Sequence, residues 1–123
     1  MKMYTVMLVN YDISIIAEQK EILTRNGYTV VGETTDVDQI ADKLKHLNPD
    51  IIILAHHPAN FDCIEVIKTI QSICNPIIII SSIYDTATGV VCEAMQLGTK
   101  GWVIPFPSQH EIMLLEQVKF ALI

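Results

Sequence analysis

A run of four apolar residues at positions 51–54, Ile-Ile-Ile-Leu, constrains the fold more than any other stretch of the chain. Pro49 and Asp50 precede the run, and the polar residues His56 and His57 follow it closely. The run is short and rich in β-branched residues, and apolar and polar residues do not alternate within it. This pattern is typical of a strand that is buried on both faces of a sheet.

Strand and helix signals alternate along the whole chain, five times each. We expect strands at residues 4–9, 28–32, 51–54, 77–80 and 101–104. The predicted helix starts are Asp12, Thr35 or Asp36, Asp62, Thr86 or Thr88, and Ser108, the last paired with Glu111 in a capping box. Such alternation gives a parallel sheet with helices on both faces. We therefore predict one α/β domain over residues 1–123, with a doubly wound, flavodoxin-like five-stranded sheet in the order 2-1-3-4-5 and three α/β/α layers.

Apolar residues at helical spacing predict which sides of the helices face the core. The expected inward residues are Ile13, Ile16 and Leu23 in the first helix, Ile64, Ile67 and Ile70 in the third, and Ile112, Leu115, Val118 and Leu122 in the last.

Charge and cysteine content exclude several classes of function. The net charge is −6, so direct binding of nucleic acid is not expected, because that requires clustered Lys and Arg. Only 18% of the residues are charged, which leaves apolar surface for a protein partner. The apolar runs are too short to span a bilayer, and no secretory signal opens the chain. Cys63, Cys74 and Cys92 lack metal-site spacing, and we expect reduced thiols in the cytoplasm.

In this topology the ligand site lies at the carboxyl ends of the strands. Those ends carry Asn10, Tyr11 and Asp12 after the first strand, Ala55 and His56 after the third, and Ser81 and Ser82 after the fourth.

A set of frame residues follows in a fixed order from the third expected strand to the end of the fifth: Pro49-Asp50, Asp62, Pro76, Gly98 and Pro105-Phe106. Their spacing resembles the response-regulator receiver domain family, of the chemotaxis-regulator type. The resemblance implies an acidic pair that holds magnesium, an aspartate that accepts a phosphoryl group, a switch Ser or Thr, and a lysine before the proline of the fifth strand.

Only one of these chemical groups has a match in this chain. Asn10 and Tyr11 stand where the resemblance implies the acidic pair, and Asp12 falls one place later. Ala55 stands at the acceptor position, and Ser81 matches the switch residue. The lysine is absent, since Lys100 lies too early in the segment. The resemblance therefore predicts a degenerate pseudo-receiver that has no catalytic residue, metal or cofactor, because phosphoryl transfer needs a nucleophile and a divalent cation.

Several residues allow two interpretations. His56 and His57 point to opposite faces if extended, so we favour two loop histidines over a metal-binding or proton-sensing site of His56 with Asp12. For Ser81 we favour a hydrogen bond to loop backbone over a switch role. Tyr11 is expected to fill the emptied pocket with its ring, and Cys63 to be buried and inert rather than activated by a helix start.

The predicted function is a phosphorylation-independent receiver module of a two-component system. It would bind a protein partner or a second copy through the face of the fourth helix, fifth strand and fifth helix, around Trp102, although a plain core or edge tryptophan is equally compatible. One alternative is a ligand or metal sensor that uses Asp12, His56 and Ser81. Another is a phosphorelay member that is phosphorylated on His56.

The resemblance also bears on the peptide bond between Ile104 and Pro105. The family commonly has a cis bond at this proline, whereas the general frequency before proline is about 5–6%. The segment is one residue shorter than the family pattern, so cis and trans both remain open.

Overall fold

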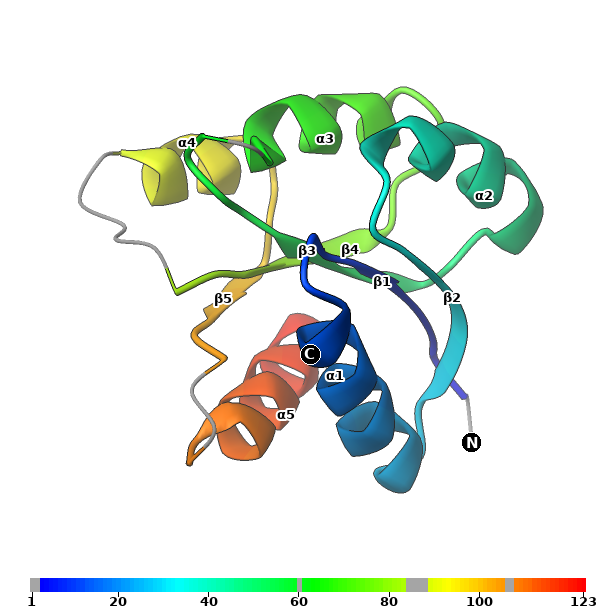
Figure 1. Cartoon of the computed structure of the whole chain (residues 1–123), viewed down its shortest axis with the longest axis vertical. Coiled ribbons are helices and arrows are strands. Elements are labelled where there is room, and N and C mark those ends of the chain that lie inside the picture. Colours follow the sequence, from blue (N-terminus) through cyan, green and yellow to red (C-terminus); the bar gives the residue numbers. More distant parts are fainter. Residues whose placement is uncertain (1–2, 60, 84–88, 106–107) are drawn as a thin grey trace.

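The computed structural model describes residues 3–59, 61–83, 89–105 and 108–123. It has a five-stranded parallel sheet in the order β2-β1-β3-β4-β5, which confirms the predicted topology. Figure 1 shows α1 and α5 on one face of the sheet and α2, α3 and α4 on the other. The elements in chain order are β1 (Thr5–Val9), α1 (Ile13–Arg25), β2 (Thr29–Thr34), the 3-10 turn η1 (Val37–Gln39), α2 (Ile40–Leu47), β3 (Ile51–Ala55), α3 (Cys63–Gln71), β4 (Ile77–Ser81), α4 (Val90–Gln96), β5 (Gly101–Val103) and α5 (His110–Ala121).

The predicted buried strand, β3, lies at the centre of the sheet and is buried along its whole length. Ile52 and Leu54 pack toward α2, α3 and α4, while Ile51 and Ile53 pack toward α1 and α5. Complete burial of such a side chain contributes about 1.5–3 kcal/mol each. The centre of the sheet is therefore a firm base for the residues at its carboxyl edge.

Three of the predicted helix caps are present. The Oδ1 atoms of Asp12, Asp36 and Asp62 each accept a hydrogen bond from the backbone N–H two residues later, at 2.9, 2.9 and 3.0 Å. Side-chain acceptors of this kind satisfy the free N–H groups of a helix start. Of the two predicted starts Thr35 and Asp36, the structure uses Asp36. Helix α4 begins after Gly89. The predicted starts at Thr86 and Thr88 lie outside the described residues.

The predicted capping box of the last helix is wrong. Gln109 is the N-cap of α5 and makes no side-chain capping bond. Glu111 instead accepts hydrogen bonds from Arg25 at 2.7 Å and from Asn26 at 3.3 Å. These bonds lower the pKa of Glu111, with the Asn26 bond as the larger cause. The sequence pattern assigned the Glu111 carboxylate to the helix cap, but this carboxylate binds Arg25 and Asn26 at the end of α1 instead.

The predicted inward sides hold for α3 but only in part for α1 and α5. Ile64, Ile67 and Ile70 are all buried. Ile13 at the start of α1 is 72% exposed, and Ile112 in α5 is 63% exposed. The buried stripe of α5 instead runs through His110, Leu114 and Val118, because His110 packs inward against α1.

Two further observations concern the described residues as a whole. The described residues contain no cis peptide bond, so the bond between Ile104 and Pro105 is trans and the cis possibility is wrong. The shortened segment closes here without the bond that the family commonly uses. No helix in the described residues is both long enough and apolar enough to cross a membrane.

Candidate functional site

The carboxyl ends of β1, β3 and β4 lie side by side, as the topology predicted. Val9 pairs with Leu54, and Ala55 pairs with Ser81. Asn10, which follows Val9, therefore lies at the same edge as Ala55 and Ser81, and all three residues are buried. This edge is the candidate site.

The turn from β1 to α1 uses its polar groups for its own structure. The Asn10 Oδ1 atom accepts a hydrogen bond from the Asp12 N–H at 2.9 Å. The Asp12 Oδ1 atom in turn accepts from the Ser14 N–H at the start of α1. The backbone N–H of Asn10 donates to the Thr34 carbonyl at the end of β2. The side chains of Asn10 and Asp12 thus hold this turn in place.

Tyr11 packs on the loop that follows β3. Its ring meets the His57 ring edge-on, with centroids 5.4 Å apart, and lies 5.8 Å from the buried Phe61 ring. His57 and Phe61 form a short antiparallel bridge through two backbone hydrogen bonds. Tyr11 remains 38% exposed, so it covers this loop from outside instead of filling a pocket.

His56 is buried, and both its ring and its backbone are engaged. Its Nδ1 atom accepts a hydrogen bond from the Cys63 N–H at the start of α3, and its carbonyl accepts from the Ser82 hydroxyl at 2.9 Å. An Nδ1 atom that accepts from an amide carries no proton, so the proton of the neutral ring is on Nε2. Burial is the main cause that lowers the pKa of His56, with His57 adding to it and Asp62 opposing it.

The expected hydrogen bond of Ser81 to loop backbone is wrong. Its Oγ atom accepts from the Gln19 Nε2 atom of α1 at 3.0 Å. The loop-backbone bond is made by the next residue, Ser82. The reason is the pleat: successive side chains in a strand point to opposite faces, and Ser81 faces α1.

Sequence reasoning missed a buried polar chain that leads from Ser81 to the surface. Gln19 Nε2 lies 3.0 Å from Ser81 Oγ and 3.3 Å from His110 Nε2, and His110 Nδ1 lies 2.8 Å from Glu18 Oε1. Since a carboxylate only accepts, His110 donates from Nδ1 and accepts at Nε2 from Gln19. The chain therefore runs from a half-exposed carboxylate, through three buried side chains, to the end of β4.

One atom of this buried polar chain lacks a hydrogen bond among the described residues. The Gln19 Oε1 atom is buried and has no hydrogen-bond partner in the described part of the chain. The signal that could have found the chain is the position of Gln19, which lies three residues from both Ile16 and Ile22 on the buried side of α1. A polar residue at such a position needs a partner across the core.

Lys100 lies at the opposite edge of the sheet from Ala55. Its backbone N–H donates to the Ile78 carbonyl near the start of β4, and it precedes β5. In a parallel sheet the residue before a strand and the residue after it lie at opposite edges.

The cysteines show no reactive environment. Cys63 is buried, and burial is the main cause that raises the pKa of its thiol to about 12, which confirms the inert reading. Burial also raises the pKa of Cys74. Cys92 is exposed on α4.

The proposed sensor residues do not meet in one cavity of those found here. A cavity of about 380 Å³ is lined by His56 but not by Asp12 or Ser81. Among the described residues no group of three or more His, Cys, Asp or Glu could hold a metal ion.

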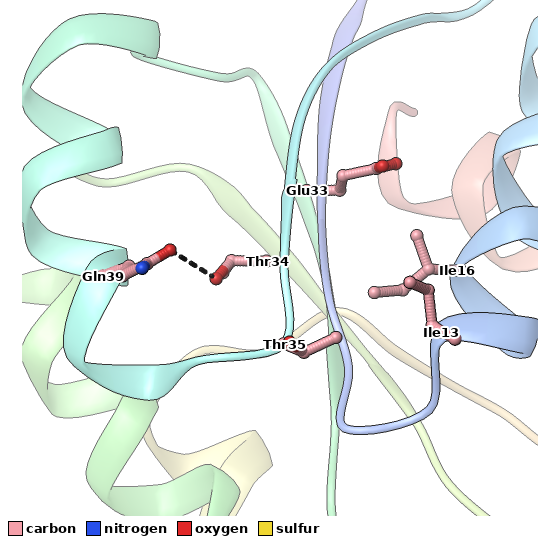
Figure 2. Close-up of a pocket in the computed structure, with 6 residues that line it drawn as sticks. All are labelled: Ile13, Ile16, Glu33, Thr34, Thr35 and Gln39. Carbon is pink, nitrogen blue, oxygen red and sulfur yellow. Dashed lines mark hydrogen bonds between the residues drawn. The ribbon is translucent and has the colours of Figure 1, made fainter.

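Another cavity, of about 240 Å³, lies at the end of β2 and contains none of the predicted site residues. Figure 2 shows its lining on the two sides of the β2 chain, with Thr34 and Gln39 on one side and Glu33, Ile13 and Ile16 on the other. The Thr34 hydroxyl is already bonded to the Asp36 backbone and lies 3.5 Å from Gln39 Oε1.

Trp102 lies on β5 beside a third cavity, of about 260 Å³, which α4, β5 and α5 line together. Its Nε1 atom is buried and has no hydrogen-bond partner in the described residues. Its backbone N–H donates to Gln117 Oε1 on α5 at 3.3 Å. Met95 on the α4 wall is 63% exposed. Trp102 is thus half-buried beside this cavity, and its buried indole N–H is unpaired among the described residues.

No family model matches the chain. The chain is 33% identical over 103 residues to the chemotaxis protein CheY of Thermotoga maritima, covering 80% of this chain and 83% of that protein. It is 31% identical over 92 residues to CheY of Bacillus subtilis, covering 74% and 77%. The response regulator domain of Thermotoga maritima CheB superposes with a TM-score of 0.83 over 99% of this chain and 98% of that domain, at 19% identity, and so shares the fold. Because these two CheY sequences are more than 30% identical to it over most of their length, the chain belongs to the CheY-like response-regulator receiver family.

Proposed function

We propose that this chain is a receiver module of a two-component system that works without phosphorylation, through contact with a protein partner or a second copy. The observation that carries this proposal is Ala55 at the carboxyl end of β3, paired with Ser81 and only 1% exposed. A methyl group has no lone pair with which to attack phosphorus.

The surrounding residues offer little to a cation. Magnesium needs near-octahedral oxygen coordination and is usually held by one or two carboxylates. Asn10 Oδ1 and Asp12 Oδ1 are each occupied by a backbone N–H. Asp12 is the only carboxylate of the turn, and its main task is the cap of α1. This arrangement supports a receiver that does not depend on magnesium.

Neither neighbouring nucleophile is a good substitute acceptor. His56 Nδ1 is occupied by the Cys63 N–H, and Nε2 carries the ring proton, so neither nitrogen offers a free lone pair. Ser81 Oγ is buried and accepts from Gln19. Phosphorylation on His56 Nδ1 would displace the Cys63 N–H at the start of α3, which disfavours the phosphorelay alternative.

The partner surface that we propose is the α4–β5–α5 face around Trp102. Receiver domains of this family typically interact with proteins, and aromatic anchors dominate many interfaces. Gln117 occupies the backbone N–H of Trp102 on the open side of β5. This favours docking of a partner's side chains onto the face over the addition of a strand to the sheet edge.

The proposal also covers the domain organisation of the protein and its location in the cell. We propose that residues 1–123 act as one receiver-like unit in the cytoplasm and that the unit itself carries no catalytic residue. The unit then contributes to signalling only by binding or releasing its partner.

The test is incubation with acetyl phosphate and magnesium, read by intact mass. CheY of Thermotoga maritima in a parallel reaction is the positive control for the phosphodonor. We expect no mass gain for this chain. A clean gain of one phosphoryl group, mapped by peptide analysis to any residue of the strand-end site, would overturn the proposal.

A further inference from the structure

The cavity of about 380 Å³ beside His56 has an unusual lining. It lies between the loop after β3, the start of α3 and the start of α4. Three carboxylates lie around it, and no Lys or Arg is among the described residues of its wall, which are His56, Pro58, Asp62, Ile64, Glu65, Val90 and Glu93. Its volume is within the range of roughly 300–1,000 Å³ typical of ligand pockets.

The side chain of His56, which is largely buried, faces this cavity. His56 is 5% exposed, and its Nδ1 atom is turned to the Cys63 N–H, so the ring proton is on Nε2. In the described residues the Nε2 atom has no hydrogen-bond partner. Because His56 lines the cavity, this N–H group can donate to an acceptor that an occupant of the cavity offers.

The carboxylates are only weakly neutralised. Glu65 lies 3.9 Å from Lys68, and both side chains are more than half exposed, so this pair contributes little. Asp62 and Glu93 form no ion pair in the part of the chain that the structure describes. The negative charge of Asp62 and Glu93 also contributes to the raised pKa of Cys63, behind burial. The rim therefore favours a cation.

We infer that this cavity docks a basic segment of a protein partner. One backbone carbonyl of that segment accepts a hydrogen bond from His56 Nε2–H, and an arginine side chain lies among Asp62, Glu65 and Glu93. The combination of a donor at the base and carboxylates at the rim selects this occupant. A metal ion cannot use a protonated Nε2, and a simple polyamine has no acceptor for it. Arginine matches several carboxylates through its planar fork of donors.

This surface differs from the face around Trp102. Val90 and Glu93 line the cavity beside His56, whereas Val91 and Met95 line the cavity beside Trp102. The inference does not rest on the absence of phosphorylation, because it depends only on the charges and hydrogen bonds of the α3–α4 side.

The experiment is a titration of ¹⁵N-labelled protein with the peptide acetyl-Gly-Arg-Gly-amide, followed by amide and histidine-ring NMR signals. The matched probe is the same peptide with citrulline in place of arginine, which keeps the shape and removes the charge. We expect saturable shifts at Cys63, Ile64 and Glu93 and at His56 Nε2, at least tenfold weaker with the citrulline peptide.

The variant test uses Glu65→Gln/Glu93→Gln, which removes two rim charges without touching the capping residues. We expect at least tenfold weaker binding of the arginine peptide. The control is Asp42→Asn/Glu116→Gln, which makes the same change in net charge away from the cavity and is expected to bind as the parent does. Equal loss in both double variants, equal binding of the two peptides, or no saturable shift at these residues would overturn the inference. Concentration-dependent shifts at the same residues without peptide would also overturn it, since the occupant would then be a second copy.

Discussion

At the carboxyl ends of β1, β3 and β4, Asn10, His56 and Ser81 each have a partner inside the chain, whereas beside β5 the indole Nε1 of Trp102 has none among the described residues. The first region is buried and closed by hydrogen bonds, while the second is half-exposed and lies beside an open cavity. The contrast indicates that the polar side chains at the strand ends mainly stabilise the fold, whereas the face around Trp102 keeps an exposed, partly apolar cavity.

The largest expected effect is at the closed region. We predict that Ala55→Asp lowers the free energy of unfolding by about 3 kcal/mol or more, because it places a carboxylate in a buried position without a counter-charge. The loss should be greater at neutral pH than in mild acid, since burial raises the pKa of the introduced carboxyl group. Urea unfolding at the two pH values measures both effects.

The neutral control at this position is Ala55→Ser, which should cost less than Ala55→Asp. We also expect Ala55→Asp to gain no phosphoryl group with acetyl phosphate, because the acidic pair and the lysine are still missing. A phosphorylated, fully stable Ala55→Asp protein would show that the strand ends are not closed.

A second, smaller effect is expected within the buried polar chain. Gln19→Leu should destabilise the protein by about 2–3 kcal/mol, because it leaves Ser81 Oγ and His110 Nε2 without their shared donor. Denaturant unfolding measures this change. Gln39→Leu, at an exposed position, serves as the control and should stay within about 0.5 kcal/mol. An equal effect of the two substitutions would mean that the buried chain contributes nothing.

At the open region, binding should change without loss of the fold. Trp102→Ala is expected to weaken partner binding or self-association by about 2 kcal/mol, which is about thirtyfold. Circular dichroism checks the fold, and sedimentation and titration calorimetry measure association. Tyr11→Ala, an exposed aromatic residue at the strand ends, should leave association unchanged. Weaker association of Tyr11→Ala together with unchanged association of Trp102→Ala would mean that the strand ends, and not the face around Trp102, bind the partner.

The smallest expected effect is the pH dependence that His56 contributes. Its pKa is lowered in the folded state, chiefly by burial, so below about pH 6.5 the unfolded chain binds more protons than the folded chain. The contribution to stability is complete above that pH and is lost as the pH falls toward the folded-state pKa. Comparing unfolding at several pH values between the parent and His56→Asn isolates it, and an unchanged pH profile in the variant would contradict it.

Local chemistry explains what the sequence could predict. The run at β3 and the caps Asp12 and Asp62 depend on neighbours within a few residues, and the predicted topology then brings Asn10, Ala55 and Ser81 to one edge. The chain's interactions at long range were not predictable in this way.

The partners of Ser81 and Glu111 illustrate the limit. Gln19 lies 62 residues before Ser81, and Arg25 lies 86 residues before Glu111. In both cases α1 supplies the partner, which only the packing of α1 beside α5 (Figure 1) and the bond from Gln19 to the end of β4 reveal. A capping box is a local rule, and it fails where a distant cation competes for the same carboxylate.

The contact between Gln117 and β5 bears on how the protein behaves at high concentration. The side chain of Gln117 fits beside Gly101 so closely that a Cβ atom there would approach Gln117 Oε1 to 2.5 Å. Any larger residue at position 101 would push the glutamine away and leave the Trp102 N–H uncovered. Uncovered strand edges are where sheets of separate molecules join and precipitate. The lack of a Cβ atom at Gly101 is therefore expected to disfavour edge-to-edge pairing of separate molecules through β5.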